Sequence, residues 1–292
     1  MSRPYQLIDV FTATPFRGNP LAVVLDGAGL DDAEMQRFTD WTNLSEATFL
    51  LPPTRPDADY RVRIFCPGRE LPFAGHPTLG SCHAWLRAGG RPRGDEVVQE
   101  CGAGLVRIRR EGTRLAFAAP PLIKSGPLAE ADVLLIARGL GIPREDILHH
   151  AWCDNGPNWR GVMLASAEQV LALRPDGAIL AGLDVGVIGP RGKVGVVAPR
   201  DANRDLDTDA FEVRAFFPGV QGLAEDPVTG SLNAALGQWL IGAGLAPERY
   251  VARQGTALGR AGRVHVSRDL TGQVWVGGES VCCVEGRLHS GL

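Results

Sequence analysis

His76 and Asp226 are the polar residues whose settings in this sequence first suggest chemistry. Each directly precedes a proline that opens a segment of small and apolar residues, and proline suits the first position of a helix. We therefore expect both side chains at or near helix N-caps, beside N–H groups that lack a partner and carry partial positive charge. Two such helix starts can bind anionic groups such as carboxylates, and Ser81 and Ser231 could add hydroxyl donors one turn further on.

Glu46 is the third candidate. It directly precedes the apolar run Ala-Thr-Phe-Leu-Leu. A carboxylate at the entrance of an apolar strand loses hydration, which disfavours its charged form and moves its pKa toward the range useful for acid–base catalysis. Each of the three residues also fits a purely structural role. Asp before Pro is a common helix cap, a single His often packs in a core, and Glu46 could be a solvated strand end.

Short β-rich segments bounded by Gly, Pro, Asp or Asn predict the strands that would position these side chains. In the first half they fall at 5–11, 21–25, 47–52, 60–65, 105–110 and 114–118. In the second half they fall at 161–165, 184–189, 193–198, 211–217, 263–267, 273–277 and 280–286. Helical patterns cover 31–42 and 127–141, while 77–90 and 227–244 are small or apolar on all sides, as expected for helices enclosed by sheet.

A repeat relates the two halves of the chain. The segment 62–68 reads V-R-I-F-C-P-G and 213–219 reads V-R-A-F-F-P-G, at an offset of 151 residues. The segment 76–81, H-P-T-L-G-S, matches 226–231, D-P-V-T-G-S, at an offset of 150. One match at about half the chain length indicates duplication. We expect domains at 1–118 and 119–292, and a pseudo-two-fold between them would let His76 and Asp226 face each other across an interdomain cleft.

Composition excludes several classes of protein. The length of 292 residues fits two domains at roughly 150 residues each, and 45% apolar residues are ample for a core. Lys and Arg total 30 against 33 Asp and Glu, so no basic excess favours nucleic acid or a membrane surface. No apolar run approaches the roughly 20 residues of a membrane span. Six scattered cysteines without CxxC spacing are typical of free thiols in a reducing cytoplasm.

Four segments together resemble the phenazine-biosynthesis PhzF-like proteins, relatives of diaminopimelate epimerase and proline racemase. They are FTATPFRGNPLAVV (11–24), NLSEATFL (43–50), PGRELPFAGHPTLGS (67–81) and EDPVTGS (225–231). The resemblance covers nearly the whole chain in order. It implies an α+β fold of two similar domains, each a β-barrel-like sheet wrapped around a central helix, with the active site between them.

The resemblance also implies a cofactor-free isomerase that acts on a small carboxylate-bearing substrate, of the dihydro-hydroxyanthranilate isomerase type. One glutamate moves the proton in this family, with His and Asp beside it, and the matching catalytic positions are Glu46, His76 and Asp226. The matching motifs supply these substrate-binding candidates: Asn19, Ser45, Gly75, Thr78, Thr229, Gly230 and Ser231. A cytoplasmic homodimer is expected.

The absence of cysteine from AGHPT and DPVTGS sets the expected reaction apart from the wider superfamily, whose racemases invert a stereocentre with two cysteines. A single carboxylate can instead take a proton from one carbon and return it to another on the same face, which is an allylic isomerisation. A racemase or epimerase with non-cysteine bases and a non-catalytic small-acid-binding relative remain alternatives. No metal site is expected, because His149, His150 and Cys153 lack an evident fourth ligand.

Overall fold

The computed structural model describes residues 2–192, 209–219 and 222–289. The chain divides into two compact units. The first unit comprises 1–118 and 277–292, and the second comprises 119–276. The expected boundary after residue 118 coincides with this division. The expected assignment of 277–292 to the C-terminal domain does not, because this stretch belongs to the first unit, where 280–289 pair with the N-terminal strand. The predicted strand at 193–198 lies outside the described residues.

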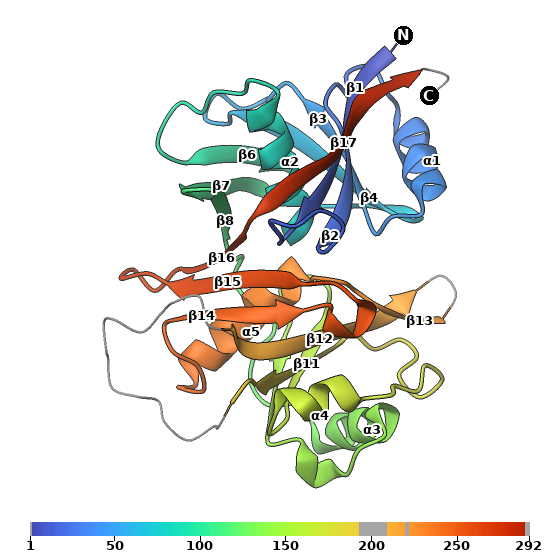
Figure 1. Ribbon diagram of the computed structural model, residues 1–292, viewed down its shortest axis with the longest axis vertical. Coiled ribbons are helices and arrows are strands. Elements are labelled where there is room, and N and C mark those ends of the chain that lie inside the picture. The colour runs from blue at the N-terminus through green and yellow to red at the C-terminus, as the bar shows by residue number, and fades with distance from the viewer. Residues whose placement is uncertain (1, 193–208, 220–221, 290–292) are drawn as a thin grey trace. The chain divides into compact units, whose positions relative to one another are not determined.

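The first unit is built mostly of strands. They are β1 (Ser2–Val10), β2 (Asn19–Val24), β3 (Ala47–Leu51), β4 (Tyr60–Cys66), β5 (Arg69–Leu71), β6 (Val97–Cys101), β7 (Gly104–Glu111), β8 (Arg114–Ala118) and β17 (Ser280–His289). Its helices are α1 (Asp32–Thr42) and α2 (Gly75–Arg87). Figure 1 shows β17 running alongside β1, and the register extends from Ser2 opposite His289 to Val10 opposite Ser280.

Helix α2 is the centre of the first unit. It packs against β1, β2, β3, β6, β8 and β17, so strands surround it. Gly80 allows this close approach, because a Cβ at that position would lie 2.6 Å from a methyl carbon of Leu21 and 2.9 Å from one of Val10. The small residues that made this segment apolar on all sides therefore serve a helix enclosed by sheet, as expected.

The second unit contains β9 (His149–Cys153), β10 (Trp159–Met163), β11 (Val185–Pro190), β12 (Asp209–Gly219), β13 (Gly222–Glu225), β14 (Arg249–Gln254) and β15 (Gly262–Arg268). Strand β16 (Val274–Gly278) runs across the chain boundary between the units. The helices are α3 (Glu130–Leu140), α4 (Ala167–Ala172) and α5 (Gly230–Gly242), with short 3-10 turns η1 (Arg144–Asp146) and η2 (Thr256–Leu258).

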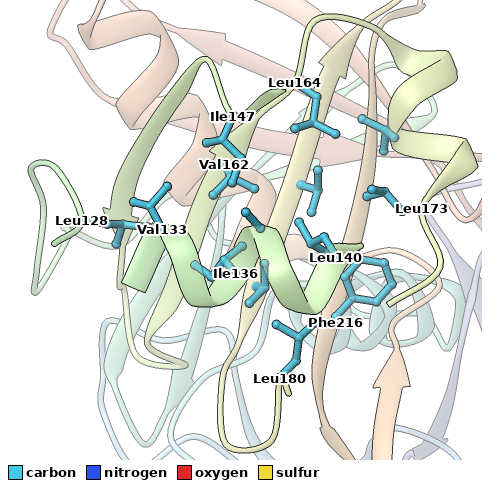
Figure 2. Close-up of a cluster of buried hydrophobic side chains, with 14 of the residues drawn as sticks. Leu128, Val133, Ile136, Leu140, Ile147, Val162, Leu164, Leu173, Leu180 and Phe216 are labelled. Carbon is cyan, nitrogen blue, oxygen red and sulfur yellow. The ribbon is translucent and has the colours of Figure 1, made fainter. Parts of the chain in front are cut away.

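A large apolar cluster lies between α3 and the strands of the second unit. Figure 2 shows Val133, Ile136 and Leu140 of α3 directed toward side chains of the sheet, including Val162 and Phe216. All five side chains are buried. Burial of apolar surface stabilises a fold by about 25 cal/mol per Å², so this cluster contributes to the stability of the unit. Helix α3 packs on one side of the sheet, whereas helix α5 is enclosed by strands and most of its residues are buried.

The two units repeat one strand topology. In the first, β1–β2 is antiparallel, β2–β3 parallel, β3–β4 antiparallel, β4–β6 parallel and β6–β7 antiparallel, with β5 a hairpin on β4. In the second, β9–β10, β10–β11, β11–β12, β12–β14 and β14–β15 follow the same sequence of orientations, with β13 a hairpin on β12. Helices α2 and α5 follow the equivalent hairpins. The sequence repeat is therefore a repeat of fold.

The repeated V-R-x-F segment has a defined role in the first unit. Arg63 of β4 forms two hydrogen bonds to the carboxylate of Glu70, at 2.8 and 2.5 Å, across the β4–β5 hairpin. Its guanidinium also lies 5.0 Å from the ring centre of Phe65 and 2.7 Å from Asp32 of α1. One arginine therefore ties the hairpin to the outer helix.

The second unit reproduces this arrangement. Arg214 of β12 donates to both carboxylate oxygens of Glu225, at 2.9 and 2.7 Å, and lies 4.8 Å from the ring centre of Phe216. It also donates to the backbone carbonyls of Val170 and Leu173 at the end of α4. Helices α1 and α4 occupy equivalent places in the strand order. The arginine of the repeated V-R-x-F segment therefore links the hairpin to the equivalent helix in each unit.

Candidate active site

Glu46 lies between α1 and β3, where the chain turns from helix to sheet. Asn43 ends α1 in a left-handed conformation, with φ of 54°, and β3 begins at Ala47. Helix α1 is anchored at its other end by a capping box between Asp31 and Glu34. Both ends of α1 are thus fixed, and the side chain of Glu46 is 16% exposed at the entrance of the apolar strand. The predicted strand entry is confirmed.

His76 is the second residue of α2 and is 4% exposed. It lies two residues after the N-cap, near the expected place, but the expectation that Pro77 is the first helical residue is wrong by two positions. The N-cap is Ala74, and Pro77 is the third residue of the helix. The first turn tolerates Pro77 because an N–H at that position would have no partner within the helix. Burial lowers the pKa of His76 to about 3, so its imidazole is neutral near pH 7.

Glu46, His76 and Asn19 come together in the first unit. Nε2 of His76 is 3.4 Å from Oε2 of Glu46, and Nδ1 on the other side of the ring is 3.3 Å from Nδ2 of Asn19. Asn19 is the first residue of β2 and is fully buried. The imidazole therefore bridges a buried amide and a partly exposed carboxylate. Such an arrangement can orient the carboxylate and hold it ready to take or return a proton.

The start of α2 offers backbone donors next to this carboxylate. Gly75 and His76 are its first two residues, and their N–H groups have no partner within the helix. Thr78, also expected to bind substrate, is engaged internally. Its N–H donates to the carbonyl of Ala74, and its hydroxyl accepts a 3.0 Å hydrogen bond from Gln99 of β6. Thr78 thus fixes the helix start, and its N–H is not available to a ligand.

A glutamine also holds the corresponding helix start in the second unit. The N-cap of α5 is Thr229, three residues after Asp226, so Asp226 lies near the helix start but the expectation that it caps the helix is wrong. Gln254 of β14 accepts a hydrogen bond from the N–H of Thr229 at 3.0 Å and donates to its hydroxyl at 2.9 Å. It also donates to the carbonyl of Asp226 and accepts from Asn233. Strands β6 and β14 therefore each supply a glutamine that holds a threonine near a helix start, although the two glutamines occupy different positions in their strands.

Ser231 is oriented by residues that the sequence did not single out. The indole Nε1 of Trp159 donates to Oγ of Ser231 at 3.1 Å, and Nδ2 of Asn155 donates to the Ser231 carbonyl at 2.9 Å. An accepted hydrogen bond leaves the Ser231 hydroxyl proton for another acceptor. Gly230 and Ser231 are the first two residues of α5 and present N–H groups without partners in the helix. No motif pointed to Trp159 or Gln254.

The remaining predicted site residue, Ser45, is half-buried next to Glu46. The cysteines nearest the motifs lack thiolate character, since burial raises the pKa of Cys82 to about 12 and also raises that of Cys66. Within the described part of the chain, no group of three or more His, Cys, Asp and Glu side chains is arranged to hold a metal ion. Across those same residues no helix has the length and apolar character needed to cross a membrane.

The two units share one topology, and each has a helix enclosed by strands. The protein therefore belongs to the class of two-domain α+β proteins that was expected from its sequence. Residues 8–286 match the family model for phenazine biosynthesis-like proteins, PhzC-PhzF. The chain belongs to this family, as its motifs predicted, and it is an isomerase.

The chain is similar along nearly its whole length to several other proteins. It is 32% identical over 294 residues to the trans-2,3-dihydro-3-hydroxyanthranilate isomerase of Pseudomonas aeruginosa, covering 98% of this chain and 99% of that one. It is 36% identical over 298 residues to a Schizosaccharomyces pombe protein named antisense-enhancing sequence 1, covering 97% of each. A predicted epimerase structure from Pseudomonas aeruginosa is 27% identical, with a TM-score of 0.77 over 99% of both chains.

Proposed function

We propose that this protein is a cofactor-independent isomerase that moves a proton between two carbons of a small, unsaturated carboxylic acid. The contact between Glu46 and the buried, neutral His76 carries the proposal, because it places a carboxylate against a hydrogen-bonding side chain. The relative named trans-2,3-dihydro-3-hydroxyanthranilate isomerase supports a substrate of that type.

The proposed reaction uses Glu46 twice. Its carboxylate takes a proton from an acidic C–H of the substrate, and the electron pair of that bond moves into the adjacent double bond system. The protonated Glu46 then returns the proton to the far carbon of the allylic system. One C–H bond breaks, another forms and the double bond moves, so the reaction is balanced without an oxidant or reductant. General acid–base catalysis of this kind contributes roughly 100- to 10,000-fold in rate.

Substrate binding is proposed to use the N–H groups of Gly75 and His76, because a helix start favours a carboxylate. Asp226, Gly230 and Ser231 are proposed as further site residues. The match between HPTLGS and DPVTGS and the equivalent places of α2 and α5 support this assignment. Thr229 and Thr78 are proposed to act only by fixing the two helix starts.

Glu46→Gln tests the proposal most directly. The test compares it with wild type and with Glu145→Gln, a change at an exposed glutamate in η1. Each protein is incubated in D2O with trans-2,3-dihydro-3-hydroxyanthranilate and a panel of small unsaturated acids, and the products are followed by NMR. We expect Glu46→Gln to bind ligand within a few-fold of wild type and to lose roughly 100- to 10,000-fold in turnover. Near-wild-type turnover by Glu46→Gln would overturn the role of Glu46.

The same experiment separates the alternative functions. Movement of the double bond identifies an isomerase. Deuterium at an α-carbon with loss of optical rotation identifies an epimerase, which the name of the Pseudomonas aeruginosa structure also suggests. Tight binding without any exchange identifies a binding protein.

We also propose a homodimer in the cytoplasm. All six cysteines are free, which supports a reducing compartment. Sedimentation of the purified protein measures the oligomeric state.

A further inference from the structure

Asn19 is buried behind the proposed catalytic pair. It is 0% exposed, and the ladder between β1 and β2 fixes its backbone, with Asn19 opposite Val10. Its side chain reaches the imidazole of His76 on the edge opposite Glu46. Asn19 therefore contacts the imidazole directly and can affect the carboxylate of Glu46 only through that ring.

The two contacts together favour one position for the proton of the imidazole. A neutral imidazole has one N–H and one lone pair. When the Asn19 amide donates to Nδ1, the proton is on Nε2 and points toward the carboxylate of Glu46, so that both contacts join a donor to an acceptor. With the proton on Nδ1, the lone pair of Nε2 would face a carboxylate oxygen at 3.4 Å, and two acceptors would repel each other.

We propose that Asn19 is a positioning residue that holds His76 in the Nε2–H tautomer, so that His76 donates a hydrogen bond to the carboxylate of Glu46. This N–H holds the base in its ionised form and aims it at the substrate. After Glu46 has accepted the substrate proton, the same N–H donates to the remaining carbonyl oxygen of the carboxyl group. No proton passes to Asn19. The two atoms are 3.4 Å apart in the structure, longer than a typical hydrogen bond, so the proposed donation requires them to move closer when substrate binds.

This proposal rests on the proposed role of Glu46 and replaces the substrate-binding role that the GNPLAVV motif implied for Asn19. The amide faces the imidazole and so acts on the reaction through it. A merely structural asparagine would affect stability without selecting one tautomer of His76.

The test is ¹⁵N NMR of the histidine side chains in the full-length protein, with His76→Gln identifying the His76 signals. We expect Nε2 of His76 to carry the proton in wild type. In Asn19→Asp, an accepting carboxylate takes the place of the amide donor, so the proton moves to Nδ1 or the ring becomes charged. We expect kcat to fall on the order of 100-fold while KM changes little. Asn158→Asp, at an exposed asparagine of the second unit, makes the same chemical change as a control and leaves both readouts unchanged.

A second variant keeps the test informative if a buried aspartate prevents folding. Asn19→Leu has a similar size but no hydrogen bond, and we expect it to give both tautomers of His76 and an intermediate kcat. Wild-type His76 protonated on Nδ1 would overturn the proposal, and so would an unchanged kcat in a variant with altered tautomer. Failure of the proposed function has a different signature, which is full turnover by Glu46→Gln while wild-type His76 still carries its proton on Nε2.

Discussion

His76 gives the protein a specific sensitivity to acid. In the unfolded chain its imidazole takes up a proton below about pH 6.5, whereas burial keeps the folded pKa near 3. Protons therefore bind preferentially to the unfolded state, and stability falls as pH drops from 6.5 toward 3. The expected loss from this residue is about 1.4 kcal/mol per pH unit in that window.

Urea denaturation from pH 7 to pH 4 measures this effect. In His76→Gln the slope of unfolding free energy against pH becomes shallower by about that amount, because Gln does not titrate. Coincident slopes for wild type and variant would show that His76 is not the residue responsible.

In the second unit, Trp159 is a single residue whose hydrogen bond orients Ser231. Trp159→Phe keeps most of the buried ring but removes the indole N–H that donates to Ser231. We expect KM to rise by roughly two- to ten-fold, the value of one hydrogen bond, because the Ser231 hydroxyl loses its fixed orientation. A double-mutant cycle with Ser231→Ala checks the cause. The effect of Trp159→Phe on KM disappears in the Ser231→Ala background if it acts through this hydroxyl, and additive effects would contradict it.

At the scale of elements, the enclosure of α2 depends on its lack of side-chain bulk at Gly80. In Gly80→Ala the new methyl group meets side chains of Leu21 and Val10, and overpacking outweighs the gain in helix propensity. We expect a net loss of about 1 to 2 kcal/mol in unfolding free energy. Gly242→Ala, at the exposed end of α5 with no atom within 4 Å of the added carbon, is the matched control. It should be neutral or stabilising by up to about 1 kcal/mol, and equal effects at both positions would refute the packing argument.

Elements with local signals could be predicted from sequence. The capping box of α1 and the left-handed glycine after α3 fix those helices within a few residues, and the strand following Glu46 begins as expected. Strands β5 and β13 are only three and four residues long, and β9, β6 and β14 lack a clear alternation of apolar and polar residues. Their pairing partners, which are distant in sequence, stabilise them instead.

The same distinction explains the candidate site. Motifs identified Glu46 and His76, and the structure brings them into contact. Gln254 and Trp159 escaped notice because their importance comes from hydrogen bonds to residues 25 and 72 positions away. The starts of α2 and α5 were misplaced because the prediction relied on His-Pro and Asp-Pro, whereas the N-caps are Ala74, which cannot cap with its side chain, and Thr229, whose side chain forms no capping hydrogen bond.

For the whole molecule, the return of β17 to the first unit has a measurable effect. A chain that lacks 280–292 leaves β1 without the partner that it pairs with along its full length. We expect hydrogen exchange to show loss of protection in β1, β2 and α2, while β10, β11 and α3 stay protected within their own core. Undiminished protection of β1 in the truncated chain would show that β17 is dispensable.

The same pairing also imposes an order on synthesis. The second unit is one continuous stretch, 119–276, and is complete as soon as that stretch leaves the ribosome. The first unit begins earlier but obtains its last strand only after the entire second unit has been made. The half translated later can therefore fold first, in contrast to the usual N-terminal-first order for domains. Until β17 arrives, nascent chains expose an unpaired edge of β1, the kind of surface on which chaperones act and misassembly begins.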